Sequence, residues 1–201
     1  TRRSSDLEPD LRKTIRAIQS YIYHFELEFG RENDYFHLRG QDNILRYLPL
    51  GRIMVRVHKK DSLFEVLARI AAVHITGNEL IVSIPPDTQS TAVKFLQGED
   101  GKRILQGTEL SYHTDEQVIE MIPNLKRIRY AAQDRVPQAV FKAAAETGFY
   151  IARTPVMMEG QIELMQYFQQ QAVCNTYHRY GNLGERTHLK LKRNRSVIEE
   201  Y

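Results

Sequence analysis

The turn around His58 is the first place where this sequence could do chemistry. Residues 51–57 read as a strand, residues 61–76 as an amphipathic helix, and residues 80–84 as a second strand. A strand–helix–strand unit that binds a nucleotide needs glycines at its first turn, because they let the backbone approach the pyrophosphate and aim helix N–H groups at it. The turn His58–Ser62 reads HKKDS and contains no glycine. The sequence therefore predicts the scaffold of a dinucleotide-binding unit without its phosphate loop.

The same turn permits an alternative interpretation, in which it still holds a phosphate. Lys59 and Lys60 supply positive charge, and the predicted helix begins at Ser62, where its first N–H groups carry a partial positive charge. The chain would then be an independent nucleotide-binding module with a degenerate phosphate loop. A titration with NAD separates this alternative from a turn that binds no nucleotide.

A second concentration of polar and aromatic side chains lies at Asn175–Gly184 (NTYHRYGNLG). Tyrosine and arginine are residue types that anchor protein interfaces, and glycine lets the backbone follow an irregular surface. Two interpretations stay open: a turn-rich connector, or a docking segment that lines another domain or subunit. The candidate docking residues are Asn175, Thr176, Tyr177, His178, Arg179, Tyr180, Gly181 and Asn182.

The rest of the chain offers no recognisable catalytic or metal-binding pattern. None of the seven histidines has a metal-ligand spacing to a cysteine, aspartate or glutamate, and neither a G-x-S-x-G nor an S-x-x-K motif occurs. Cys174 is the only thiol, and it lies in the run Ala172–Thr176 without an adjacent cation, so we expect a buried structural cysteine. The sequence predicts no catalytic, cofactor-binding or metal-binding residue in this chain.

The composition is that of an ordinary globular chain. The 201 residues are 42% apolar and 26% charged with both signs mixed, which is enough to bury a full core as one domain with an appendage. No apolar run approaches the roughly 20 residues that span a membrane, and no signal-peptide pattern is present. A single cysteine excludes an internal disulfide and suits a reducing, cytoplasmic setting.

The basic excess is small and partly local. The formal net charge is +3, and residues 186–195 hold five arginines or lysines and no acid. We interpret this stretch as a solvated tail; the alternative, a module that binds nucleic acid, would show in a salt-dependent binding assay. No aromatic residues alternate with these charges to stack on bases. We therefore expect neither nucleic acid nor a membrane among the partners.

The N-terminal part predicts one long amphipathic helix that ends at Gly30. Its apolar residues recur at spacings of four and three, which places them in one stripe. A stripe this regular has to pack on the following domain or on a part of a parent protein outside this chain. The stripe residues are Leu11, Ile15, Ile18, Ile22, Phe25 and Phe29.

Downstream, predicted strands alternate with helices of 8 to 16 residues, which is typical of an α/β fold with a mostly parallel sheet. We predict a three-layer, Rossmann-like arrangement. The domains would be 1–39 (helix and connector), 40–184 (α/β domain) and 185–201 (basic tail). Further predicted elements are helices at 88–96, 114–122, 137–148 and 159–171, strands at 109–113, 127–131, 149–152 and 173–177, and a polar connector at 31–50.

Several short motifs resemble one known family. Asn175-Thr176, four residues, then Gly181-Asn182 is similar to the signature that ends the bifunctional proline-catabolic flavoenzymes called proline utilization A, and related pyrroline-5-carboxylate dehydrogenases. Asn43–Pro49 resembles the entry to the C-terminal domain of those enzymes. Residues 61–77 resemble the alanine-rich helix of its first βαβ unit, and Ile162–Leu164 resembles the helix before the signature. The resemblance covers roughly residues 40–184.

The resemblance implies a parent enzyme that oxidises proline with FAD and then oxidises glutamate semialdehyde to glutamate with NAD. Its C-terminal domain would have a degenerate aldehyde dehydrogenase fold without activity or cofactor of its own. That domain would serve as a structural, channel-covering or oligomerisation element, packed on the dehydrogenase domain of the same chain in a homo-oligomer. By this resemblance Asn175, Thr176, Gly181 and Asn182 would be packing residues.

Two departures from the family pattern bear on the docking surface. Residues 177–180 are Tyr-His-Arg-Tyr where the family has small residues, and the chain continues 17 residues beyond Gly184. We therefore expect a docking surface that differs from the family's. The chain begins with Thr1, and we expect it to be a piece of a longer polypeptide, with the proline-oxidising half of the parent left open.

Overall fold

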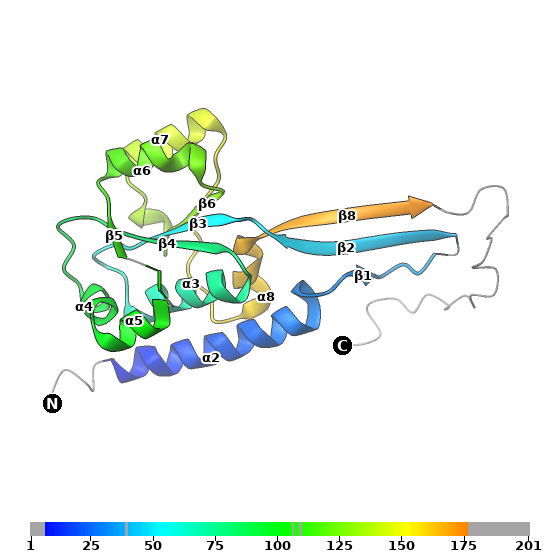
Figure 1. The fold of residues 1–201 in the computed structure, drawn as a ribbon, viewed down its shortest axis with the longest axis horizontal. Helices are drawn as coiled ribbons and strands as arrows, with labels where there is room; N and C mark the ends of the chain where they lie inside the picture. Colours follow the sequence, from blue (N-terminus) through cyan, green and yellow to red (C-terminus); the bar gives the residue numbers. More distant parts are fainter. Residues whose placement is uncertain (1–6, 39, 106, 109, 177–201) are drawn as a thin grey trace. The chain divides into compact units, whose positions relative to one another are not determined.

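The computed structural model describes residues 7–38, 40–105, 107–108 and 110–176, and it divides into two compact units (Figure 1). The larger unit comprises Thr1–Phe25 and Pro49–Phe168, and the smaller unit comprises Glu26–Leu48 and Gln169–Tyr201.

A five-stranded parallel sheet forms the centre of the larger unit, with strand order β5-β4-β3-β6-β7. The chain builds outward from the central β3 to one edge and then returns to β3 to build the other half. This is the order of a doubly wound nucleotide-binding fold. The strands are β3 (Arg52–Arg56), β4 (Glu79–Ile84), β5 (Leu110–Tyr112), β6 (Arg127–Arg129) and β7 (Ile151–Ala152).

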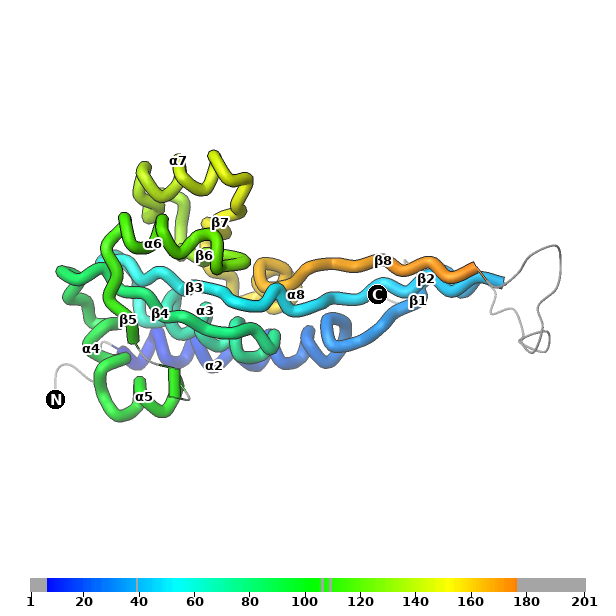
Figure 2. The backbone as a smooth tube through the Cα atoms, turned by 45° about the horizontal axis from the view of Figure 1, so that its top comes forward, coloured from blue at the N-terminus to red at the C-terminus, as the bar shows by residue number. Residues whose placement is uncertain are grey.

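Helices cover both faces of this sheet, as the ribbon and tube views agree (Figures 1 and 2). On one face Met54 and Ile128 pack with Val118 and Val140 from two helices. The other face is covered by α3, in which nine of thirteen residues are buried. The α/β, three-layer, Rossmann-like prediction is confirmed. The helices between the strands are α3 (Leu63–Ile75), α4 (Thr91–Gln97), α5 (Glu99–Leu105), α6 (Asp115–Met121) and α7 (Gln138–Thr147).

The N-terminal helix α2 (Glu8–His24) packs on α3 and on the short helix α8 (Gly160–Glu163), but not through the expected stripe. Its buried residues are Thr14, Ala17 and Tyr21, whereas Ile15 and Ile22 are 57% and 44% exposed. Close approach decides the contact face, because a Cβ at Gly160 would lie 2.5 Å from the Ser20 carbonyl oxygen. The stripe is therefore only partly buried in the larger unit, and its burial on a partner stays a prediction.

One predicted element near the end of the described chain is wrong. The helix expected over 159–171 is reduced to α8 and a 3₁₀ turn (Leu164–Tyr167), and β8 (Phe168–Thr176) follows at once. The Tyr167 carbonyl accepts hydrogen bonds from the Leu50 N–H and the Asn78 side-chain amide, so it is not available to continue a helix. The apolar residues Ile162 and Met165 of this stretch are 54% and 56% exposed, whereas Phe168 is buried.

The region expected to be a polar connector, 31–50, contains strands instead. β1 (Asn33–Asp34) and β2 (Gln41–Pro49) pair antiparallel, with Asp34 opposite Ile44, and a three-stranded sheet has the order β1-β2-β8. A five-residue π-helix (Phe25–Phe29) follows α2. Within the smaller unit the Phe29 and Tyr47 rings meet edge to face. No helix in the described ranges has both the length and the apolar character of a membrane-spanning segment.

Candidate functional site

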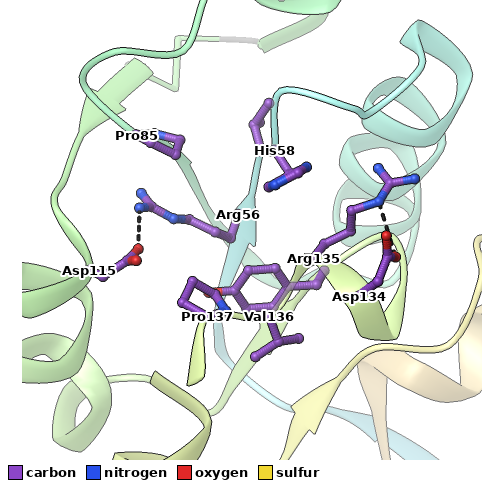
Figure 3. A pocket seen from close by; sticks show the side chains of 10 residues that line it. Arg56, His58, Pro85, Asp115, Asp134, Arg135, Val136 and Pro137 are labelled. Atoms are coloured by element: carbon purple, nitrogen blue, oxygen red, sulfur yellow. Dashed lines mark hydrogen bonds and ion pairs between the residues drawn. The ribbon is translucent and has the colours of Figure 1, made fainter. Parts of the chain in front are cut away.

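The carboxyl ends of β3 and β6 diverge at the point where the strand order reverses, and a cavity of about 260 Å³ lies there (Figure 3). Ligands of open α/β sheets bind outside the carboxyl ends of the strands at this reversal. The lining residues come from the ends of β3, β4 and β6 and from the starts of α6 and α7: Arg56, Val57, His58, Pro85, Asp115, Tyr130, Asp134, Arg135, Val136 and Pro137.

The turn before α3 is occupied by the protein's own carboxylates. Asp61 Oδ2 accepts a hydrogen bond from the His58 backbone N–H at 2.9 Å. Glu65 Oε2 accepts from the Ser62 N–H at 2.7 Å, and the Ser62 hydroxyl accepts in turn from the Glu65 N–H, which forms a capping box. In a nucleotide-binding unit such N–H groups face the pyrophosphate. Here intramolecular carboxylates take those donors.

A buried guanidinium fills the space between the two diverging strands. Arg69 of α3 is 0% exposed, and its Nη1 donates to the carbonyl oxygens of Arg56 and Arg129 at 2.9 and 3.0 Å, at the ends of β3 and β6. Its Nη2 donates to Asp61 at 2.6 Å. Arg135 donates to the second oxygen of the Asp61 carboxylate, also at 2.6 Å. The Arg69–Asp61–Arg135 network therefore closes the crevice between β3 and β6 with side chains that are paired.

Arg56 ties the neighbouring strand ends together at the cavity wall. Its Nη1 donates to the Ser83 hydroxyl at 2.8 Å and to the His113 carbonyl at 2.9 Å, and its Nη2 donates to Asp115 at 2.9 Å. The close-up shows the Arg56 guanidinium reaching toward Asp115, with His58 on the opposite side (Figure 3). One half-buried ion pair thus joins the ends of β3, β4 and β5 to the start of α6.

Burial favours the neutral forms of two residues at the cavity, His58 and Tyr130. Burial lowers the pKa of His58, and the positive charges of Arg135, Lys60 and Lys59 lower it further against an opposing effect of Asp61. Burial raises the pKa of Tyr130. His58 Nδ1 accepts from the Lys60 N–H, so the imidazole proton sits on Nε2. The arrangement offers hydrogen-bond donors, and none of the lining residues is a nucleophilic thiol or serine.

The candidate docking residues are only partly described. Asn175 and Thr176 are the exposed last residues of β8 in the smaller unit. Tyr177, His178, Arg179, Tyr180, Gly181 and Asn182 lie outside the described residues, so their docking role stays a prediction.

Cys174 is not the buried structural cysteine that its sequence context predicts. It is exposed on β8, and its Sγ accepts a hydrogen bond from the Gln41 amide at 2.6 Å. The error has a simple cause: nearly all of β8 after Phe168 is exposed or half-buried, so an apolar neighbourhood in sequence does not produce burial there. Within the described ranges, no group of three or more histidines, cysteines, aspartates or glutamates could hold a metal ion.

Sequence reasoning missed the buried arginines that define this region. Arg56, Arg69 and Arg129 are the largest fully buried side chains of the described chain. A signal was present, because two strands that run through the core each end in arginine, and Arg69 stands in the middle of a mostly apolar helix, eight residues after Asp61. Charged residues at core positions point to partners that are also buried.

Comparisons with solved structures show where this fold occurs. The chain is similar to proline utilization A (PutA) from Corynebacterium freiburgense, with 26% identity and a TM-score of 0.54 over 83% of this chain and 14% of that one. A PutA variant from Bradyrhizobium japonicum has 15% identity and a TM-score of 0.58 over 75% and 16%. Succinate-semialdehyde dehydrogenase from Burkholderia pseudomallei has 12% identity and a TM-score of 0.51 over 74% and 31%.

The matched region is a small part of each of these proteins. The chain spans 14% to 16% of the PutA chains and 31% of the succinate-semialdehyde dehydrogenase. No protein-family model and no curated protein matches the sequence. The expected resemblance is confirmed at the level of a PutA- or aldehyde-dehydrogenase-like domain.

Proposed function

We propose that this chain, whose fold is that of a PutA- or aldehyde-dehydrogenase-like domain, is a non-catalytic domain of a larger proline-catabolic enzyme. The parent would oxidise glutamate semialdehyde to glutamate with NAD, and with FAD where it also carries the proline-oxidising half. The chain would act as a structural, channel-covering or oligomerisation element in the cytoplasm. Its partners would be the dehydrogenase domain of the same polypeptide and further copies of the protein.

One observation carries the non-catalytic part of this proposal. The crevice that receives a dinucleotide in a doubly wound fold is filled here by Arg69, Asp61 and Arg135. The backbone N–H groups of the turn before α3 donate to the carboxylates of Asp61 and Glu65. A pyrophosphate would have to displace two carboxylates, one of which is fully buried between arginines. Aldehyde oxidation also needs a thiol beside the nicotinamide, and the cavity has none among its lining residues.

The direct test is NAD binding and turnover by this chain. Calorimetric titration with NAD should give no binding, and NAD with glutamate semialdehyde should give no NADH. The full-length parent, assayed in parallel, is the positive control. Turnover by this chain that disappears on Cys174→Ser would overturn the proposal.

The docking part requires a different test in the parent. Tyrosine side chains anchor interfaces, so Tyr180→Ala should weaken assembly or lower aldehyde oxidation in the full-length protein. The same change should alter the free energy of unfolding of this chain by no more than about 1 kcal/mol. Unfolding of the isolated chain with normal specific activity of the parent would contradict a docking role.

The alternative function is an independent nucleotide-binding module. The strand order favours it, because the site lies at the reversal between β3 and β6, and Lys59 and Lys60 flank the turn with exposed side chains. This alternative predicts NAD or ADP binding that a Lys59→Ala, Lys60→Ala double variant loses. The non-catalytic proposal predicts no saturable binding by either protein.

A further inference from the structure

Tyr130 has a buried hydroxyl that lacks a partner. The residue follows β6, lines the cavity and is 1% exposed, and its hydroxyl makes no hydrogen bond within the described ranges. The Arg56 guanidinium lies close enough to lower the Tyr130 pKa through its charge and a weak polar contact, against the larger effect of burial. That contact does not have the geometry of a hydrogen bond, so the hydroxyl stays without a well-aligned partner. Because buried hydroxyls in folded proteins are nearly always paired, this one indicates a missing acceptor or donor at the cavity.

The other polar groups at the wall show which kind of partner is missing. Arg56 makes its three hydrogen bonds through Nη1 and Nη2 and none of them through Nε. His58 carries its proton on Nε2, because Nδ1 already accepts from Lys60. Tyr130, Arg56 and His58 thus line one cavity of the larger unit, and each of them carries an O–H or N–H donor.

The acceptors around the same cavity are already engaged. Asp61 accepts from the His58 N–H, Arg69 and Arg135. Asp115 accepts from Arg56. Asp134 lies within ion-pair distance of Arg135 and Lys60. The cavity thus presents unused donors beside carboxylates that already have partners, which suits a ligand that brings acceptors.

The helices that begin at this edge of the sheet also favour a negatively charged ligand. α3 and α6 each start with a capping box, through Ser62 and Thr114. α7 starts directly after Pro137, a lining residue, and has no side-chain cap. Uncapped N–H groups at a helix start carry a partial positive charge, which favours an anion nearby.

The size and the remaining lining limit the ligand. Val57, Pro85, Val136 and Pro137 give the cavity apolar walls. A volume of about 260 Å³ lies below the roughly 300–1,000 Å³ of sites for drug-sized ligands. The two guanidiniums at the wall, Arg56 and Arg135, already pair with Asp115 and Asp61, so they suit one further negative charge better than a phosphate dianion.

We propose that this cavity binds a small organic carboxylate, whose oxygens accept from Arg56 and Tyr130 and whose apolar part packs against Val136 and Pro137. The ligand supplies the acceptor that the Tyr130 hydroxyl lacks. The site is independent of nucleotide binding, because it uses the cavity side of Arg56 and leaves the Arg69–Asp61–Arg135 network intact. It is also independent of the docking role, since all of its residues belong to the larger unit.

The test is a titration of the whole chain followed by amide NMR, with acetate, propionate, isobutyrate and benzoate, each beside its neutral amide. We expect saturable shifts at His58, Ala131 and Gln138 with at least one acid, and binding about tenfold weaker for its amide, since a charge-assisted hydrogen bond is lost. Inorganic phosphate and NAD form separate arms. Tighter binding of phosphate than of every acid would overturn the choice of a carboxylate.

Matched variants link the binding to the cavity. Tyr130→Phe removes only the unpaired hydroxyl and should weaken the acid about tenfold, the effect of one hydrogen bond to a charged group. Tyr150→Phe, which alters an exposed tyrosine of the same unit, should leave the affinity unchanged. Val136→Phe, which places a ring at the cavity wall, should abolish binding. Failure of every acid to bind, or equal affinity of the wild type and Tyr130→Phe, would overturn the proposal.

Discussion

Arg56 and Arg129 end neighbouring parallel strands and are 2% and 0% exposed, yet their surroundings differ. Arg129 donates through Nε and Nη2 to Glu163, at 2.8–3.1 Å, and Glu163 is itself 1% exposed. The Tyr167 hydroxyl and the Met157 N–H also donate to that carboxylate. Arg56 pairs with Asp115, whose side chain is 37% exposed, and it borders a cavity.

The difference separates a structural arginine from one that can bind. The Arg129–Glu163 pair is enclosed, with both charges and the surrounding polar groups satisfied inside the protein. Such a pair contributes to specificity of packing. Removing one of its partners lowers the free energy of unfolding strongly, because the other charge stays buried without compensation. Arg56 is held less completely, so part of its hydrogen-bonding capacity faces the cavity. Arginine therefore has a structural role at the end of one strand and borders a candidate binding site at the end of the next.

The largest expected effect comes from breaking the enclosed pair. Glu163→Ala would leave Arg129 as a buried charge without its carboxylate and should lower the free energy of unfolding by about 3–5 kcal/mol. Glu146→Ala, at an exposed position of α7, should change it by no more than about 0.5 kcal/mol. Chemical denaturation of the two variants gives the comparison, and equal midpoints would show that Arg129 does not depend on Glu163.

Breaking the half-open pair should cost less. Asp115→Asn keeps the shape of the side chain but removes its charge, while Arg56 retains its bonds to Ser83 and the His113 carbonyl. Because Asp115 is 37% exposed, solvent screens the lost interaction, and we expect a loss of about 1 kcal/mol in the same experiment. A loss as large as that of Glu163→Ala would remove the distinction between the two regions.

The histidines near Arg56 should make this region sensitive to acid. Burial is the main cause that lowers the pKa of His58 and of His113, and nearby positive charges add to it. A histidine with a lowered pKa in the folded state binds fewer protons than in the unfolded state. Stability is therefore present above the unfolded pKa of about 6.5 and is lost as the pH falls from there toward the folded values.

The check is a series of melting temperatures between about pH 7 and pH 5. The wild type should lose stability toward acid, and His58→Gln with His113→Gln should flatten this dependence. Glu163→Ala, although less stable throughout, should retain the wild-type slope from the two histidines. An unchanged slope in the double histidine variant would assign the acid sensitivity to other groups.

The smallest expected effect is at Tyr130, and its sign is informative. Tyr130→Phe removes a buried hydroxyl without a partner, so it should leave the free energy of unfolding unchanged or raise it by up to about 1 kcal/mol. Tyr167→Phe is the matched change beside Arg129, and it removes a hydroxyl that donates to Glu163 at 2.8 Å. That variant should be destabilised, and a loss of similar size at Tyr130 would mean that its hydroxyl is paired within the protein.

Much of the larger unit was predictable because local and tertiary signals agree there. β-Branched runs such as residues 53–57 and 80–84 form the buried strands. A capping box of Thr114 with Gln117 starts α6 within the helix predicted over 114–122. Gly148 ends α7 with a φ of +69°. In these places a short stretch of sequence decides the conformation without help from distant residues.

The sequence interpretation failed where distant contacts decide. The apolar periodicity of 159–171 suits a helix. However, Leu50 and Asn78, which are far away in sequence, donate hydrogen bonds to the Tyr167 carbonyl, and an extended strand follows. The Arg69–Asp61–Arg135 network and the Tyr130 cavity were missed for the same reason. From sequence alone an arginine is assigned to the surface, because its buried partner is not known. The absence of a hydrogen bond likewise cannot be inferred from a sequence.

The order of the strands also bears on how the molecule comes together. Met54 of β3 pairs with Ile81 soon afterwards in the chain, but with Ile128 only after three more α-helices and a strand. The half built from β3, β4 and β5 therefore has the shorter loops to close, and the β6–β7 half has to join it across the seam between β3 and β6. Arg69 bonds to the carbonyls on both sides of that seam. We expect amide hydrogens of β6 to exchange faster than those of β4, with the seam as the boundary between two cooperative folding units.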